Sequence, residues 1–182
     1  IIGRLVGSEM CIRDSMGGQT VYLDLKDAAT VDELLRCRPV EAPLVADEEL
    51  PPRWGQVCGG MKMANGTNPQ GDGGDPASRM GSAYLQRQVL SEGVERLAAY
   101  PDPEAPKRKR GSPPEPDPGP DALAQIIDGQ RTVHFHTHRA DDIVTARRLR
   151  EEFGFDLVVQ HGSEGFKVSE ELVAAGVPVA IN

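Results

Sequence analysis

The four histidines of the chain, His134, His136, His138 and His161, all fall between positions 134 and 161. Neutral imidazole is a common ligand of Zn²⁺. The first three alternate along RTVHFHTH, a strand-like segment, so we expect them to point to one face of that strand. At about 3.3 Å per residue, His134 and His138 would be roughly 13 Å apart, too far to share one ion. At most an adjacent pair can share a metal, and His161, after the next strand-like segment, is its natural complement.

A second polar group follows the segment MKMA, where Lys62, Asn65 and Asn68 stand in MKMANGTNPQG. The loop that begins here joins a strand-like segment to a helix-like one, so we expect it to wall the same pocket. Its glycines match neither GxGxxG nor the P-loop spacing, which argues against nucleotide binding. For the histidines, burial with satisfied ring nitrogens stays an alternative to metal binding. For Lys62, an ordinary charged residue near a strand end is the alternative.

Strand-like and helix-like segments alternate along the chain, and this pattern predicts βαβ units with a parallel sheet. Thr30, followed by Glu33, has the spacing of a capping box. Five strands are fewer than a closed barrel of eight needs, so we expect a partial (β/α)8 TIM barrel in an α/β fold, truncated at both ends. The expected strands are 20–26, 56–64, 131–138, 155–160 and 177–181, and the expected helices are 30–37, 78–100, 121–128, 141–153 and 163–176.

One proline-dense segment, residues 101–120, interrupts the alternation. Proline disfavours helix interiors and central strands, so the whole segment is expected to be an exposed loop. It contains KRKR at 107–110, a run that can mark a nucleic-acid patch. Acidic residues surround the run, and we therefore favour a solvated loop.

Charge and composition narrow the classes of partner. The chain has 20 basic and 28 acidic residues and a net charge of −8, which gives no support for binding nucleic acid or an anionic membrane. It contains no apolar run near 18 residues, so no transmembrane span is expected. Cys37 and Cys58 form no CxxC pair and predict neither a disulfide framework nor a zinc knuckle.

The N-terminal stretch VGSEMCIRDS, Val6–Ser15, has neither a helical nor a strand period. It resembles a translation of the adapter end used in sequencing libraries, and the apolar run before it is too short for a secretory signal. We therefore expect residues 1–15 to be a non-native segment and residues 16–182 to be a fragment of one barrel domain. On this hypothesis, unamplified DNA from the same locus would lack these codons. The compartment, cytoplasm or periplasm, is left open.

The run HTHRADDI, followed by VVQHGSEG, resembles the amidohydrolase superfamily, and specifically the imidazolonepropionase-like amidohydrolases. MKMANGTNPQG, PASRMGSAYLQRQ and GGQTVYLDLK are similar to the same branch. The resemblance extends over nearly all of residues 16–182. It implies a hydrolase of carbon–nitrogen bonds that takes a small-molecule amide or cyclic amide and uses one or two divalent metal ions, most commonly Zn²⁺.

The same resemblance assigns roles to individual residues. His136 and His161 match metal ligands at the ends of two successive barrel strands. Lys62 matches a strand-end lysine that in many relatives is carboxylated and bridges two metals, with a catalytic as well as a ligand role. His138 and Arg139 match positions that touch substrate, and Asn65 and Asn68 belong to the loop expected to wall the pocket.

The resemblance also implies ligands that this sequence does not contain: an HxH on the first strand and an aspartate after the last. The chain alone is therefore expected to be inactive. Two alternatives stay open, a catalytically dead barrel that serves as a binding or structural module and another metal-dependent barrel such as a phosphotriesterase relative. Homo-oligomerisation of the full-length protein is also left open.

Overall fold

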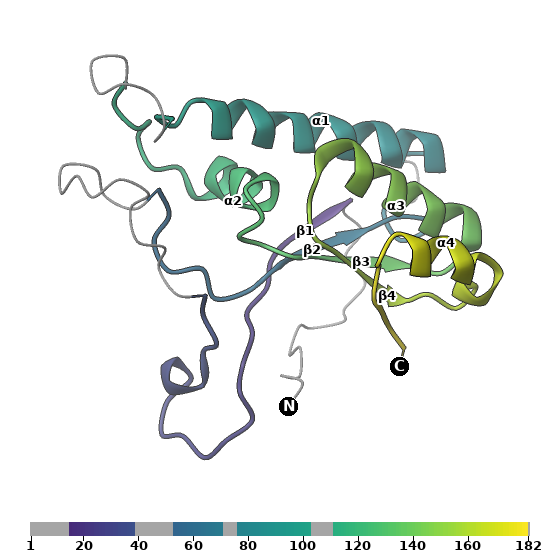
Figure 1. Ribbon diagram of the computed structural model, residues 1–182, viewed down its shortest axis with the longest axis horizontal. Coiled ribbons are helices and arrows are strands. Elements are labelled where there is room, and N and C mark those ends of the chain that lie inside the picture. Colours follow the sequence, from purple (N-terminus) through teal and green to yellow (C-terminus); the bar gives the residue numbers. More distant parts are fainter. Residues whose placement is uncertain (1–14, 39–52, 71–75, 103–110, 182) are drawn as a thin grey trace.

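The structure is a computed structural model that describes residues 15–38, 53–70, 76–102 and 111–181, and strands alternate with helices along it (Figure 1). The strands are β1 (Met16–Gln19), β2 (Met61–Ala64), β3 (Val133–Thr137), β4 (Leu157–His161) and β5 (Val179–Ala180). The α-helices are α1 (Arg79–Ala98), α2 (Pro118–Ile127), α3 (Ala140–Phe153) and α4 (Ser169–Ala174), with 3-10 turns η1 (Asp32–Leu34) and η3 (Gly165–Val168). None of the described helices is both long and apolar enough to cross a lipid bilayer.

The five strands form one sheet in the order β1-β2-β3-β4-β5. From β2 to β5 all neighbours are parallel, as the alternating pattern predicts, whereas β1 runs antiparallel to β2. The first strand was expected at 20–26 but lies at Met16–Gln19. The segment after it still follows the chain before β2, because Thr20 N–H donates to the Gly60 carbonyl and Tyr22 N–H to that of Cys58.

The two faces of the sheet differ in chemistry because side chains alternate along each strand. Odd-numbered apolar residues of β2, β3 and β4 pack with the helices into one hydrophobic core, and Figure 1 shows α1, α2 and α3 on the same side of the sheet. Even-numbered residues, such as Lys62, His134 and Gln160, lie on the other face. The largest core members are Met63, Leu90, Ile126, Phe135, Ile143, Leu149, Phe155 and Val159.

Helix α1 confirms the expected helix at 78–100 and begins at a capping residue. Ser78 is its N-cap, and the Ser78 Oγ accepts a hydrogen bond from Gly81 N–H at 3.0 Å. Its apolar periodicity is a poor guide to its buried face, since Met80 and Tyr84 are 83% and 62% exposed. Gln86 is buried instead, because its side-chain amide donates to the Ala64 carbonyl at the end of β2 at 2.7 Å.

The helix expected at 30–37 is wrong: only the single turn η1 forms there. The capping-box side chains do interact, since Thr30 Oγ1 donates to Glu33 and Glu33 accepts from Ala29 N–H. The chain then turns extended, and Arg36 N–H bonds to the Tyr22 carbonyl. Pairing with the preceding segment has overridden the local helix signal. Residues 20–38 form an arm that projects from the sheet (Figure 1).

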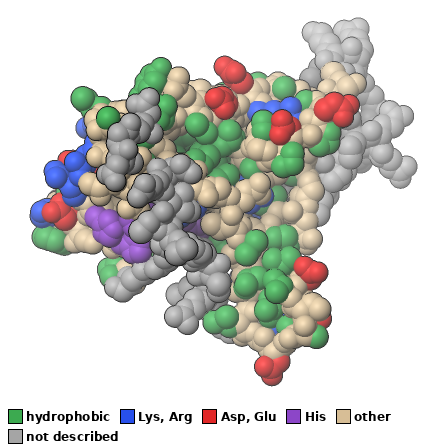
Figure 2. Space-filling view, turned by 180° about the vertical axis from the view of Figure 1, so that it is seen from behind, with side chains coloured by type: hydrophobic (Ala, Val, Ile, Leu, Met, Phe, Trp, Pro, Cys, Tyr) green, Lys and Arg blue, Asp and Glu red, His purple; other side chains and the backbone are tan. Residues whose placement is uncertain are grey.

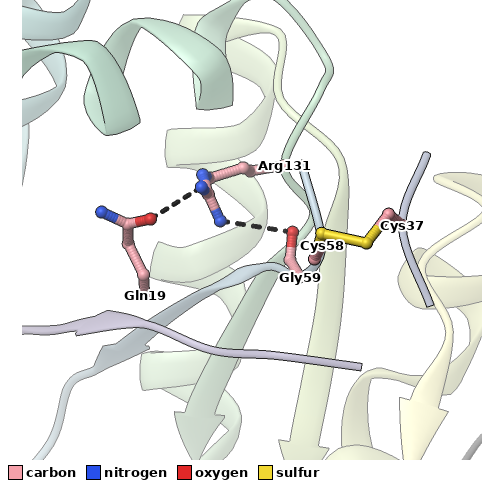
Figure 3. The surroundings of a disulfide bond; sticks show 5 residues. All are labelled: Gln19, Cys37, Cys58, Gly59 and Arg131. Carbon is pink, nitrogen blue, oxygen red and sulfur yellow. Dashed lines mark hydrogen bonds between the residues drawn. A yellow bond between two sulfur atoms is a disulfide. The ribbon is translucent and has the colours of Figure 1, made fainter. Parts of the chain in front are cut away.

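Cys37 and Cys58 form a disulfide across a sequence separation of 21 residues, which overturns the expectation of no disulfide (Figure 3). The disulfide could not be predicted from the sequence because the two cysteines belong to separate segments that only the fold brings together. Next to the disulfide, Arg38 N–H donates to the Val57 carbonyl. A glycine is required at position 59 of the same segment. A Cβ at Gly59 would lie 1.7 Å from the Thr20 carbonyl oxygen.

Arg131, just before β3, contacts the same region of the chain around Gly59. Its buried guanidinium donates to the Gln19 side chain at 2.7 Å and lies 3.5 Å from the Gly59 carbonyl oxygen (Figure 3). It also donates to the Gln125 side chain at 2.6 Å. Burial lowers the pKa of Arg131. These neutral acceptors link β1, the chain before β2 and α2.

The proline-rich segment confirms its expected exposure in part. Residues 111–117 have no regular structure and are mostly exposed. Helix α2, however, begins at Pro118, inside the segment expected to be loop, because proline is compatible with the first turn of a helix. The adapter-like residues 1–14, the glycines at 71–74 and the KRKR run at 107–110 lie outside the described residues.

The later elements follow their predictions closely. The expected helix at 141–153 is α3. The expected strands at 131–138 and 177–181 contain β3 and β5, and β4 ends one residue beyond the expected strand at 155–160. The helix expected at 163–176 is broken into η3 and α4. Since β3 and β4 and the loops after them carry the histidines, this part of the fold places the candidate site.

Candidate active site

Three of the four histidines cluster where β3 and β4 end. The ring centroids of His136 and His138 are 4.7 Å apart, those of His136 and His161 4.6 Å, and those of His138 and His161 5.2 Å. The Nε2 atoms of His136 and His138 are 3.1 Å apart. Figure 2 shows histidine side chains gathered in one patch of the surface. The predicted proximity of His136 and His161 is therefore found, and His138 joins them.

Strand register explains the cluster. β3 and β4 pair in parallel, with Thr137 opposite His161 and His136 opposite Gln160, so both histidines lie at the carboxyl edge of the sheet. His161 ends its strand with φ at 70°, and it is the non-glycine residue with positive φ among those described. A left-handed conformation in a non-glycine residue is strained and is often found at functional sites.

His138 lies just beyond the end of β3 and is exposed. Its Nδ1 is 2.8 Å from the hydroxyl of Ser163, a residue in the loop after β4. The His138 ring stacks on that of His161 with an interplanar angle of 13°. The sequence predictions missed Ser163; its signal was its position two residues after the strand-end His161.

His134 is separated from this cluster, although it shares a strand and a face with His136. It is 6% exposed, its Nε2 is 2.7 Å from the Tyr22 hydroxyl, and its Nδ1 is 3.0 Å from the Gln160 amide nitrogen. Burial, with a contribution from the positive charge of Lys62, lowers the pKa of His134 from 6.5 to about 4. His134 is thus a buried, neutral histidine with both ring nitrogens partnered.

Lys62 lies beside His134. It is the second residue of β2 and pairs in register with His134, whereas Ala64 pairs with His136. β2 continues to Ala64, so Lys62 lies two residues before the end of the strand. Parity still places Lys62 on the same face of the sheet as His136.

Asn65 follows β2 directly and holds the loop to α3. It is 5% exposed, its Nδ2 donates to the Asp142 carbonyl at 2.8 Å, and its N–H donates to the His136 carbonyl at 3.2 Å. Its Oδ1 has no hydrogen-bond partner among the described residues. Asn68 is half-buried three residues further along the loop. The first residues of this loop thus lie against the β3–α3 turn.

The start of α3 carries two acidic residues that the predictions did not single out. Asp142 is buried and accepts a hydrogen bond from Arg79 Nε at 3.1 Å, which joins α3 to α1. Asp141 pairs with both nitrogens of the Arg139 fork, at 3.0 Å each. Arg139 is exposed, and its pairing with Asp141 raises its pKa.

The described residues include histidines whose side chains could serve as metal ligands. Imidazole is a good zinc ligand, and the contact between the His136 and His161 rings suits two ligands of one ion. Among the described residues, however, no three His, Cys, Asp or Glu side chains are arranged to hold a metal. The donor set present is therefore a histidine pair that needs further ligands.

No protein-family model and no curated protein sequence matches the chain. Among solved structures, an amidohydrolase from Thermotoga maritima MSB8 superposes with a TM-score of 0.69 and 28% sequence identity over 92% of this chain. The match covers 39% of that amidohydrolase, so this chain spans about two fifths of its length. This chain has the fold of part of an amidohydrolase.

Proposed function

We propose that this chain is part of a metal-dependent hydrolase that cleaves a carbon–nitrogen bond in a small-molecule amide or cyclic amide. The observation that carries the proposal is the cluster of His136, His138 and His161 at the carboxyl ends of two adjacent parallel strands. In barrel enzymes, this edge of the sheet is where active sites are built. The amidohydrolase-like fold, together with the imidazolonepropionase-like motifs HTHRADDI and QHGSEG, supports this class of reaction.

The arrangement of the strands supports a partial barrel. β2 to β5 are parallel and sequential, and the helices cover the face of the sheet that carries the apolar residues. The opposite face carries Lys62, His134 and Gln160, as the polar lining of a barrel interior would. We infer that strands outside this chain complete the barrel, with the first-strand HxH and last-strand aspartate of the family supplying the missing ligands.

In this proposal His136 and His161 would hold a divalent metal, most simply Zn²⁺. The chemistry that bound zinc supplies is polarisation of a carbonyl and acidification of water near neutral pH. Lys62 pairs in register with His134, two residues before Ala64, which pairs with His136. It would contribute a ligand only if the metal site extends along β2 toward His134. The choice between one and two ions depends on that lysine.

Substrate would meet the exposed members of the site. His138 and Arg139 lie at the mouth of the β3–α3 turn, and the loop of Asn65 and Asn68 lies beside it. The Asp141 carboxylate holds the Arg139 fork, and Ser163 holds the His138 ring. These contacts orient the groups before substrate arrives, which is the arrangement that favours catalysis.

The experiment is to express the complete gene product, measure its metal content and screen it against amides, cyclic amides and phosphate esters. We expect a divalent metal, hydrolysis of an amide or cyclic amide, and loss of both in His161→Ala. Lys167→Ala, an exposed change outside the cluster, is the control and should retain metal and activity. Wild-type protein that binds metal but turns over only phosphate esters, or that binds no metal, contradicts the proposal.

A further inference from the structure

Glu164 joins the two loops that carry the clustered histidines. Its N–H donates to the His138 carbonyl at 2.8 Å, and its Oε2 accepts from Ala140 N–H at 3.0 Å. Its other carboxylate oxygen, Oε1, accepts from Lys167 Nζ at 2.7 Å. Each carboxylate oxygen therefore has its own partner, which fixes the orientation of the side chain.

The Ala140 contact replaces a missing helix cap. α3 begins at Ala140, and its N-cap, Arg139, makes no side-chain capping bond. The first N–H groups of a helix lack intrahelical partners and carry partial positive charge, so a carboxylate there is favourable. Glu164 thus caps a helix from a loop that follows a different strand.

Two further bonds complete the connection between the loops. Gly162 N–H donates to the Thr137 carbonyl at 3.0 Å, and Ser163 Oγ lies 2.8 Å from His138 Nδ1. The loop after β4 is therefore bonded to the β3–α3 turn by three successive residues, Gly162, Ser163 and Glu164. His161, with its strained φ of 70°, stands immediately before this connection.

We infer that Glu164 is a positioning residue that holds the rings of His138 and His161 in contact, and that metal binding by the cluster depends on it. The second part rests on the proposed function; the first does not. Without its carboxylate, the Ala140 N–H loses its partner and the loop loses its side-chain tie to α3. The left-handed His161 then has less to hold it, because strained conformations persist only when their surroundings over-determine them.

Three variants of the 182-residue chain separate the contacts. Glu164→Ala removes both side-chain bonds, and Glu164→Gln keeps a carbonyl oxygen that can accept from Ala140 N–H while losing the charge. Lys167→Ala is the matched control, because it removes the other partner of Glu164 and leaves the Ala140 bond. If Glu164→Ala does not fold, Glu164→Asp keeps the charge but is one methylene too short to reach Ala140.

The metal-free readout is the nuclear Overhauser contact between the rings of His138 and His161. We expect it in wild type, Lys167→Ala and Glu164→Gln, and we expect its loss in Glu164→Ala or Glu164→Asp. A folded Glu164→Ala or Glu164→Asp chain that keeps the ring contact overturns the positioning role.

The second readout is calorimetric titration with Zn²⁺ of the complete gene product carrying the same variants, because the histidine pair of this chain needs further ligands. We expect Glu164→Ala to weaken zinc binding about tenfold or more, the effect typical of residues that orient metal ligands, and Lys167→Ala to stay within about twofold of wild type. Wild-type affinity in Glu164→Ala overturns the metal part of the inference. If wild type itself binds no zinc while the ring contact still depends on Glu164, the proposed function fails and the positioning role stands.

Discussion

Two histidines on one strand and one face, His134 and His136, have different environments. His134 is enclosed by Tyr22 from the arm and Gln160 from β4, whereas His136 meets His138 and His161 at the sheet edge. Alternation along the strand predicts their shared face. It cannot predict that Tyr22, more than a hundred residues earlier, would reach His134. This tertiary contact separates a structural histidine from a site histidine.

The buried His134 makes stability sensitive to pH between about 6.5 and 4. Because burial lowers its pKa from 6.5 to about 4, the unfolded chain binds a proton in this range that the folded chain does not. The free energy of unfolding should therefore fall as pH drops from 6.5 to 4, by no more than about 3 kcal/mol from this group. Urea denaturation at pH 7 and pH 4.5 measures the loss.

An NMR titration assigns that loss to His134. Its ring resonances should show no midpoint above about pH 5, and a midpoint near 6.5 would contradict the account. Carboxylates with lowered pKa values, Asp121, Asp141 and Glu164, act in a different window. Their contributions are present above the ordinary carboxylate range and are lost as pH falls through their lowered values.

Gly66 presents a second residue-scale prediction. Its φ is 73°, and a Cβ there would lie 3.0 Å from the Asp142 carboxylate. Gly66→Ala should lower the free energy of unfolding by about 1–2 kcal/mol through backbone strain and crowding. Gly154→Ala is the control, since Gly154 has φ 76° and open space around it. Equal losses in the two variants, measured by urea denaturation, would show that crowding by Asp142 contributes nothing.

At the scale of elements, the arm of residues 20–38 is held to the sheet by backbone bonds, the Tyr22–His134 contact and the disulfide. Reduction, or the double change Cys37→Ser and Cys58→Ser, should lower the free energy of unfolding by about 3 kcal/mol, the effect expected for a cross-link closing a loop of this length. Amide exchange at Tyr22 and Arg36 should also become faster. An unchanged urea midpoint after complete reduction would count against a stapled arm.

The two capping sequences provide a matched pair of predictions. Ser78→Ala removes the cap of a 20-residue helix and should cost about 1 kcal/mol. Thr30→Ala removes a similar side-chain bond, but on an exposed single turn, and should cost no more than a few tenths of that. Chemical denaturation of both variants tests the contrast, and a larger loss for Thr30→Ala than for Ser78→Ala would reverse it.

Element predictions held where local and tertiary signals agree. β3, α3 and β4 have continuous apolar or amphipathic patterns and lie close to their expected bounds. The helix predicted at 30–37 does not form because its capping box competes with strand-like pairing of this segment to Tyr22 and Leu23. Apolar periodicity also does not reveal that Gln86 faces the core of the protein in α1, because this polar side chain is buried with a hydrogen bond to the Ala64 carbonyl.

At the scale of the molecule, the two faces of the sheet differ in the side chains that they carry. One face carries the apolar core under the helices, and the other carries polar side chains that lead to the histidine cluster. The proximity of His136 and His161 could be predicted because each lies at or next to the carboxyl end of a recognisable strand, and the two strands follow each other in parallel order. The contacts of Ser163 with His138, of Glu164 with Ala140 and of Asp142 with Arg79 could not be predicted. They join loops and helices that are distant in sequence.

The most direct test of the account is a Zn²⁺ titration of the complete gene product at pH 7.5, followed by NMR through the ring nitrogens of His134, His136, His138 and His161. The account predicts that His136 and His161 respond together, that His134 does not change, and that His161→Ala abolishes the response of His136. Four unchanged histidines, or a response led by His134, would contradict the assignment of this cluster as the metal end of the site.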